Sequence, residues 1–215
     1  LQTINGKAYL FSQKGILLTG TQTVGKTTYY LSDRGRLEMK KVSTGNGTLY
    51  YDGNGKKLSD VKVQDIETLE RAKKIAAEIT NSGMSQSQKL YACWKYVVYG
   101  GFYYGGPDPN IYQSGWARSE ALRMFRTGYG NCYGFSCIFA ALAREIGYTP
   151  YMICGRVPGS RDGAADGFTR HCWVKINGLY YDPEAQYAGW MTGVYGYDYY
   201  PISHQILRVV NFCKF

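Results

Sequence analysis

The chain has 215 residues and a formal net charge of +9, and 22 of its residues are tyrosines. This length can bury one medium-sized core and carry a smaller module beside it. No segment approaches the roughly 18 consecutive apolar residues of a membrane span. The positive charge comes without a basic block or a nucleic-acid motif, so we expect neither a membrane span nor a nucleic-acid partner. The chain starts at Leu1 and has no signal-peptide pattern, which is typical of part of a longer precursor.

Residues 1–60 contain a repeat with a period of twenty. Gly15, Gly35 and Gly55 each follow an aromatic run and a polar turn. A fixed period of this kind marks a repeat architecture, and short aromatic strands between Gly-rich turns predict one β-hairpin per repeat. A hairpin cannot bury its aromatic face alone, so the repeats should stack. The aromatic residues with a possible ligand contact are Tyr9, Phe11, Tyr29, Tyr30, Tyr50 and Tyr51.

These units resemble the cell-wall-binding, or choline-binding-type, repeats of surface proteins from Gram-positive bacteria. In that family, aromatic side chains of adjacent repeats hold a choline group by cation–π contact. Residues 1–60 contain no tryptophan, the usual residue of such cages. A cell-wall polymer is therefore one possible partner, and a spacer without a ligand is the other. Both imply an extracellular or cell-wall-associated protein.

From residue 61 the apolar pattern becomes helical, and we take 61–215 as a second domain. Residues 65–80 predict an amphipathic helix. Ser85 and Gln88 form a capping-box pattern that begins another. Residues 101–114 are rich in Tyr, Gly and Pro and predict a loop, and a further helix is expected over 116–126.

Cys132 opens a fourth predicted helix, over residues 132–146. The first turn of a helix has unpaired N–H groups and the positive end of the macrodipole, which favour a thiolate over a thiol. Gly128 and Gly130 precede it and allow a tight turn with room for a substrate backbone. A cysteine at a helix start can also be a packing residue.

The predicted strands 151–157, 168–176 and 179–182 follow, and Asn177-Gly178 between the last two is a strong type I′ turn signal. A two-residue turn pairs Ile176 with Leu179. His171 and Asp182 then become diagonal neighbours on one face, with side chains able to touch. A three-residue loop would turn Asp182 away.

Together Cys132, His171 and Asp182 have the order and context of a nucleophile, a base and the group that orients the base. Cys132 would form a thioester, His171 would move the proton, and Asp182 would hold the imidazole. Taken singly, His171 also fits a packed strand histidine, and Asp182 a turn residue. His204 is the rival base, but it lacks the hairpin context.

Residues of roughly 65–190 resemble the transglutaminase-like superfamily, which is related to papain-like cysteine peptidases. The resemblance is carried by Gly130-Asn131-Cys132-Tyr133-Gly134, by His171-Cys172-Trp173-Val174 and by Tyr181-Asp182-Pro183. It implies an α+β fold in which the Cys helix packs on an antiparallel sheet that carries His and Asp.

The oxyanion site is less visible. The backbone N–H of Cys132 is one expected donor. Tyr104, Tyr103 and Trp116 are candidates for the second, and each also fits loop packing or a groove wall. No cofactor, metal site or calcium site is expected, since there is no C-x-x-C pair or acidic cluster. We expect no disulfide among the six cysteines.

Two functions remain in competition. The first is a secreted or surface-attached thiol enzyme that acts on amide bonds of peptides or proteins, by hydrolysis or by transfer to an amine. Hydrolysis is favoured for a bacterial member, with protein crosslinking next. The second is a catalytically inactive transglutaminase-like fold that serves as a binding or adhesion module on the cell wall, since tyrosine-rich stretches such as 193–200 suit a carbohydrate or peptide groove.

Overall fold

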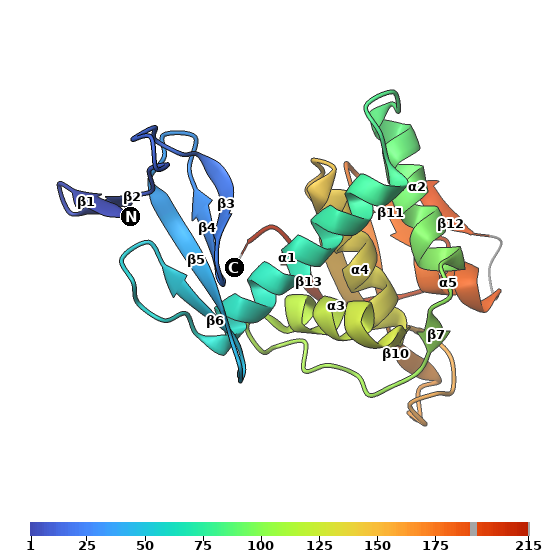
Figure 1. Ribbon diagram of the computed structural model, residues 1–215. Helices are drawn as coiled ribbons and strands as arrows, with labels where there is room; N and C mark the ends of the chain where they lie inside the picture. Colours follow the sequence, from blue (N-terminus) through green and yellow to red (C-terminus); the bar gives the residue numbers. More distant parts are fainter. Residues whose placement is uncertain (190–192, 215) are drawn as a thin grey trace. The chain divides into compact units, whose positions relative to one another are not determined.

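The computed structural model describes residues 1–189 and 193–214, and the chain divides into two compact units, Leu1–Val63 and Gln64–Phe215 (Figure 1). Within the described residues, no helix is long and apolar enough to cross a membrane. The unit boundary falls inside the first helix, α1 (Asp60–Ile79), which begins five residues before the predicted start.

The first unit consists of antiparallel strands. Its first hairpin joins β1 (Gln2–Ile4) to β2 (Lys7–Tyr9). A four-stranded sheet follows in sequential order, made of β3 (Gly20–Val24), β4 (Thr27–Leu31), β5 (Leu37–Thr44) and β6 (Gly47–Asp52). The pairs β1–β2, β3–β4 and β5–β6 are each connected by a tight turn, so each stretch of twenty residues contributes one hairpin.

One turn recurs three times in this unit, at intervals of twenty residues. In each copy a glycine with a positive φ donates its N–H to the carbonyl three residues earlier, and the next residue donates to the side chain of that same earlier residue. The glycine and its acceptor are Gly15 with Ser12, Gly35 with Ser32, and Gly55 with Asp52. The period in the sequence therefore corresponds to a repeated hydrogen-bond pattern.

The repeat aromatics differ in their exposure. Tyr9, Phe11, Tyr29, Tyr30 and Tyr51 are half-buried, and the Lys40 ammonium lies 5.1 Å from the centroid of the Tyr51 ring. Tyr50 is only 2% exposed, so it packs inside this unit and does not fit the predicted ligand contact. The small core of the unit is formed by Leu10, Leu31 and Leu37.

The second unit contains the remaining helices: α2 (Gln86–Tyr99), α3 (Trp116–Thr127), α4 (Cys132–Glu145) and α5 (Pro183–Ala188). Ser85 and Gln88 make the predicted capping box at the start of α2. None of the helices predicted from the sequence corresponds to α5. Asp182 caps it and Pro183 occupies its first position, where a missing N–H has no cost.

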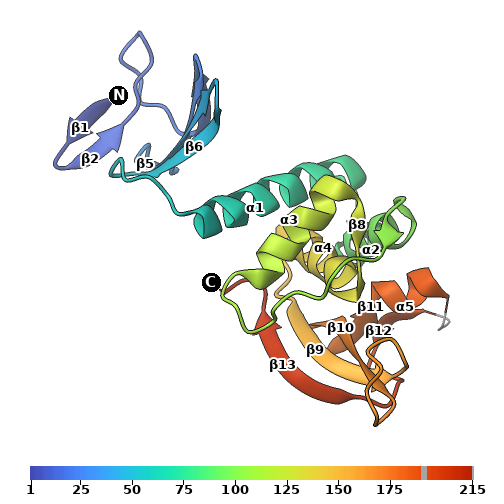
Figure 2. The same ribbon diagram turned by 90° about the horizontal axis from the view of Figure 1, so that it is seen from below.

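The helices of this unit pack against a five-stranded antiparallel sheet (Figure 2). The order of its strands is β12-β11-β10-β9-β13. Its strands are β9 (Tyr151–Pro158), β10 (Phe168–Ile176), β11 (Leu179–Asp182), β12 (Val194–Tyr197) and β13 (Gln205–Asn211). Ile176 pairs with Leu179 as predicted, because Asn177 and Gly178 both have positive φ in the two-residue turn. With this register, alternate residues of β11 and β10 share a face of the sheet as predicted, so Asp182 lies on the same face as His171.

The main core lies between the helices and one face of this sheet. Phe135, Ile138, Phe139 and Leu142 of α4 are fully buried in it. A second cluster includes Ile153, Trp173 and Tyr200. Successive residues of β10 belong to different clusters, since Cys172 and Val174 belong to the main core and Trp173 to the second. Residues on both faces of β10 are therefore buried over the stretch 171–174.

Candidate active site

Cys132 is the first residue of α4, and the local sequence explains why the helix begins there. Asn131 has extended backbone angles, and its side-chain oxygen accepts the N–H of Tyr133 at 3.1 Å. Asn131 is thus an N-cap, which leaves the Cys132 N–H at the open end of the helix. The side chain of Cys132 is 1% exposed. The thiol therefore lies at the positive end of a buried helix.

The two preceding glycines serve the fold. Gly128 has a φ of 68° and ends α3. A Cβ on Gly130 would lie 2.8 Å from the Met124 sulfur, so this glycine allows α3 to approach the start of α4. Met124 therefore occupies the space beside Gly130, while a Cβ on Gly128 would meet no atom within 4 Å.

His171 and Asp182 meet as the hairpin register predicted. The distance between His171 Nε2 and Asp182 Oδ2 is 2.7 Å. The His171 side chain is also hydrogen-bonded to Cys132. Because Nε2 faces the carboxylate, the thiol meets the ring on the Nδ1 side. Cys132, His171 and Asp182 therefore follow one another in a continuous chain of contacts.

Further hydrogen bonds fix Asp182, which is 0% exposed. Its Oδ1 accepts the N–H of Ala185 at 3.0 Å, in the cap of α5, and its Oδ2 accepts the Tyr200 hydroxyl at 2.7 Å. The Tyr200 ring stacks on Trp173 with a centroid separation of 4.2 Å. Sequence reasoning missed Tyr200, because its tyrosine-rich segment has no periodic pattern that marks one ring as inward-facing.

Electrostatics favour the protonated form of His171. Burial by itself lowers the pKa of this imidazole, but the charges of Asp182 and Cys132 and the hydrogen bonds to both outweigh it, and the pKa lies well above its usual 6.5. The imidazolium therefore persists at neutral pH and can form an ion pair with a thiolate.

Glu184 is a further buried carboxylate at this site, and its Oε2 lies 3.8 Å from His171 Nδ1. His171, Asp182 and Glu184 form a set of potential metal ligands, with one ligand atom of each within 4.8 Å of the others. Asp182 Oδ2 already accepts from His171 and Tyr200, so the hydrogen bonds of this set compete with metal coordination. The sequence predicted no metal site, whereas the two-residue hairpin register does predict that Glu184 lies beside His171.

Of the predicted oxyanion donors, Tyr104 comes nearest to the site. The two-residue strand β7 (Tyr103–Tyr104) pairs in parallel with β8 (Tyr129–Gly130), and this brings Tyr104 opposite Gly130, two residues before Cys132. Sequence reasoning had assigned residues 103–104 to a loop. Tyr103 is 69% exposed, and Trp116 is buried edge-on against Tyr133. The described contacts of these two residues include none with the thiol, and the buried Trp116 Nε1 has no hydrogen-bond partner among the described residues.

A guanidinium that sequence reasoning did not consider lies at the thiol. Arg161 Nη1 is 3.9 Å from Cys132 Sγ and 3.1 Å from the Tyr104 hydroxyl oxygen. Arg161 belongs to the polar connection between β9 and β10, where a turn was the only signal in the sequence. His204, the rival base, hydrogen-bonds the carbonyl of Ile202 at 2.8 Å, and its ring packs edge-on against Trp173 and Tyr200.

All six cysteines are free. Burial raises the pKa of the Cys93 thiol to about 12 and raises the pKa values of Cys137 and Cys172 well above their usual range. These three side chains are therefore thiols at neutral pH, as packed cysteines usually are.

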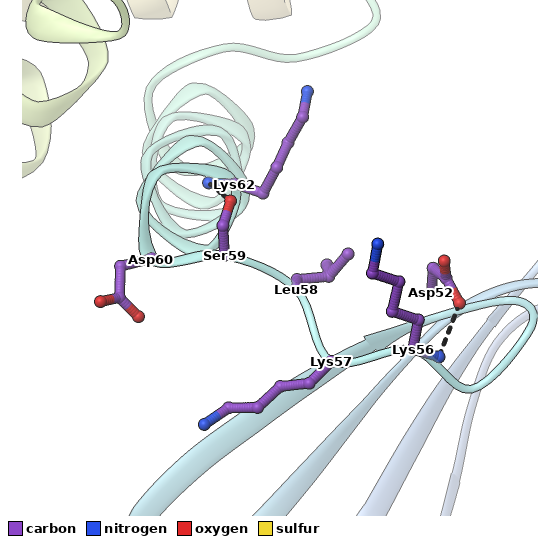
Figure 3. Close-up of a pocket in the computed structure, with 7 residues that line it drawn as sticks. All are labelled: Asp52, Lys56, Lys57, Leu58, Ser59, Asp60 and Lys62. Carbon is purple, nitrogen blue, oxygen red and sulfur yellow. Dashed lines mark hydrogen bonds between the residues drawn. The ribbon is translucent and has the colours of Figure 1, made fainter.

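A surface hollow of about 590 Å³ lies in the first unit (Figure 3). It is lined by Asp52, Lys56, Lys57, Leu58, Ser59, Asp60 and Lys62. Cys132, His171 and Asp182 are not among the residues that line it. We call this hollow the lysine groove.

The chain was compared with solved structures, with curated proteins and with models of protein families. Two solved structures match the chain: a "putative cysteine protease" from Cytophaga hutchinsonii (15% identity, TM-score 0.37, 66% of this chain and 50% of that one) and the periplasmic domain of TgpA from Pseudomonas aeruginosa (14%, 0.39, 80% and 77%). This chain thus spans only half the length of the first. We draw nothing further from these likenesses, because both TM-scores are low. No curated protein matches the chain.

The sequence model of the transglutaminase-like superfamily matches residues 73–192. This range is more than half of the chain and includes Cys132, His171 and Asp182. The mixed α and β architecture and the positions of these residues on α4, β10 and β11 agree with the expected fold class. The chain belongs to the transglutaminase-like superfamily.

Proposed function

We propose that the protein is a thiol enzyme that cleaves or transfers amide bonds of peptides or proteins through a thioester on Cys132. The observation that carries this proposal is the chain of contacts at the buried site, with His171 between the Cys132 thiol and Asp182 Oδ2 at 2.7 Å. A buried imidazole that is held protonated beside a thiol at a helix start matches the requirements of an activated cysteine nucleophile.

The roles follow from the geometry. His171 holds the proton of the Cys132 thiol at Nδ1 as an imidazolium and gives it to the leaving amine, while Asp182 accepts the N–H of Nε2. Water then resolves the thioester in hydrolysis, and an amine resolves it in transfer. We favour hydrolysis. No cofactor enters this chemistry.

We further propose that the protein acts outside the cell and that its first unit attaches it to a cell-wall polymer. The recurring turn, the half-buried aromatic side chains and the basic charge of residues 1–60 support this proposal. The rival for this unit is a spacer without a ligand.

The second candidate function is a binding module without catalysis. It is favoured by the burial of Cys132, which is 1% exposed, and by the Arg161 guanidinium against its sulfur. In this case the three residues would only stabilise the fold.

Alkylation separates the two candidates. The protein is treated with one equivalent of iodoacetamide at pH 7, and the label is located among the six cysteines by peptide mass spectrometry. An enzyme carries the label on Cys132, and Asp182→Ala slows this reaction at least tenfold. A binding module carries it on the half-buried Cys213 instead, with no effect of the substitution.

A further inference from the structure

The contacts of Arg161 indicate that this residue takes part in the reaction at Cys132 as well as in the fold. This inference rests on the proposed function. Arg161 belongs to the connection between β9 and β10, and its guanidinium contacts the sulfur of Cys132, a residue 29 positions earlier in the chain. Arginine is a planar fork of five N–H donors with fixed directions. The acceptors that the protein provides for these donors can therefore be counted.

Four of the five donors are directed at the protein scaffold. Nε donates to Asp162 Oδ1 at 3.1 Å. Nη2 donates to Asp108 Oδ2 at 3.1 Å and to the carbonyl of Arg170 at 2.8 Å. Nη1 donates to the Tyr104 hydroxyl at 3.1 Å. The remaining hydrogen is on Nη1, and the contact left for it is Cys132 Sγ at 3.9 Å.

The scaffold that holds Arg161 is itself anchored to the start of α4. Asn131, the N-cap of that helix, donates from Nδ2 to Asp108 Oδ1 at 2.7 Å. Asp108 thus links the helix cap to the guanidinium through its two oxygens. Asp162 is also fixed, because its other oxygen accepts the backbone N–H of Arg170 at 2.8 Å. The guanidinium is therefore fixed relative to Cys132 before any substrate arrives.

Tyr104 supplies a second donor beside the first. Its hydroxyl oxygen accepts from Arg161, which leaves its own hydrogen to donate. Burial raises the pKa of Tyr104, and the hydrogen bond from Arg161 only partly opposes this, so the hydroxyl keeps its proton at neutral pH. The two donor groups thus lie 3.1 Å apart, and one of them, Arg161 Nη1, is 3.9 Å from the sulfur.

We propose that Arg161, together with the Tyr104 hydroxyl, binds the carbonyl oxygen of the substrate as it becomes an oxyanion. The thiolate of Cys132 forms an S–C bond to the carbonyl carbon, and the C=O π pair moves onto oxygen. That pair then returns, the C–N bond breaks, and the leaving nitrogen takes the proton that His171 received from the thiol.

The distance fits this role. The charged oxygen is two bonds from the sulfur, so a donor 3.9 Å from the sulfur is within reach of a hydrogen bond to that oxygen once the substrate is in place. A donor fixed in advance needs no reorganisation when the charge develops, and removal of one such donor typically slows a reaction by about 10²–10³-fold.

The test compares two reactions of Cys132. Acylation by p-nitrophenyl acetate develops an oxyanion, and its leaving group needs no proton. Alkylation by iodoacetamide attacks a CH₂ carbon and develops no oxyanion. Both rate constants are taken at the plateau of their pH profiles, so that differences in thiol ionisation cancel.

Arg161→Gln should slow acylation about 100-fold while it changes alkylation less than about threefold. Tyr104→Phe should slow acylation by about tenfold, the effect of one weaker neutral donor. The matched control is Arg170→Gln, which removes a guanidinium that also contacts Asp108 and Asp162 but reaches neither Cys132 nor Tyr104 by any described contact. It should leave both rates within about threefold, as expected of an exposed ion pair.

Equal changes in both reactions of Arg161→Gln would overturn the inference, because they would mean that Arg161 controls access to the thiol. Equal loss in Arg170→Gln would overturn it too, since the charge cluster as a whole would then be responsible. Should Arg161→Gln fail to fold by circular dichroism, Tyr104→Phe carries the same comparison. Failure of the proposed function would give a different result, because the unmodified protein would then not be acylated at Cys132 at all.

Discussion

At the scale of single residues, the site depends on how His171 is ionised. Burial lowers its pKa, while the charges of Asp182 and Cys132 raise it, and the second effect dominates. A group with a raised pKa stabilises the folded state fully below its unfolded value of 6.5 and loses that contribution as the pH rises through the folded value. We therefore expect the ion pair and its stabilisation to persist above pH 6.5 and to weaken only in alkaline solution.

This expectation can be measured directly, because the chain has only two histidines. In an NMR titration, the ring of His171 should keep its imidazolium shifts well above pH 6.5, and His204→Gln identifies the signals. In Asp182→Asn the largest charge that raises the pKa of His171 is gone, so this pKa should fall. A His171 that titrates near 6.5 in both proteins would mean that Asp182 does not control it.

Tyr200 contributes at the same scale through Asp182. Tyr200→Phe removes the hydrogen bond to Oδ2 and keeps the ring stacked on Trp173. The free energy of unfolding should fall by about 1–2 kcal/mol, as for the loss of one buried bond to a charged group. Denaturant unfolding measures it, with Tyr199→Phe as the exposed control within about 0.5 kcal/mol. Equal stability of both variants would exclude this contribution.

At the scale of elements, the register of β10 and β11 could be predicted and the loops around them could not. Asn177-Gly178 allows one turn geometry, so the turn alone determines that His171 and Asp182 share a face. The capping box at Ser85 and the apolar stripe of α4 are equally local signals.

The missed parts depend on contacts between distant segments. Tyr104 reaches the site because β7 pairs with β8 in parallel, and no local pattern specifies a two-residue parallel pair. Arg161 reaches it from a loop whose sequence indicates only turns. Asp182-Pro183 fits the end of a strand or a turn, but an Asp before Pro and an acidic first turn also fit a helix start, the signal that identifies α5.

The contact between α3 and α4 gives a prediction for Gly134. A Cβ at this position would lie 2.7 Å from the sulfur of Met124, which is fully buried. Alanine in a helix normally stabilises by about 1 kcal/mol relative to glycine. Here overpacking should exceed that gain, so Gly134→Ala should lower the free energy of unfolding by about 1–2 kcal/mol.

Chemical denaturation checks this value. Gly83→Ala is the control, because there the new Cβ meets only the end of the Asn81 side chain, at 3.3 Å, and its stability should change by less than about 0.5 kcal/mol. A stabilised Gly134→Ala protein would show that α3 and α4 are not in close contact at Met124.

At the scale of the whole molecule, the charge is concentrated in the first unit. Residues 1–63 carry ten Lys and Arg against four Asp and Glu, and three of these lysines line the lysine groove (Figure 3). If this unit attaches the protein to an anionic cell-wall polymer, the attachment should weaken as salt screens the charges.

Sedimentation with insoluble cell walls of a Gram-positive bacterium tests this. Replacement of Lys56, Lys57 and Lys62 by Gln should reduce the bound fraction at low salt, and added NaCl should reduce it in the unmodified protein. The control replaces Lys73, Lys74 and Lys95, which are exposed lysines of the second unit, and equalises the net charge. Equal losses in both triple variants would assign the effect to net charge alone, and no binding at all would favour the spacer.

The central claim is that Cys132 forms the acyl intermediate, and a trapped thioester tests it most directly. The protein is mixed with p-nitrophenyl acetate at neutral pH, quenched in acid, and its peptides are analysed by mass spectrometry. We predict one acetyl group on Cys132 that hydroxylamine removes and that is absent from His171→Ala. An acetyl group on another residue, or on Cys132 at the same rate without His171, would contradict the account.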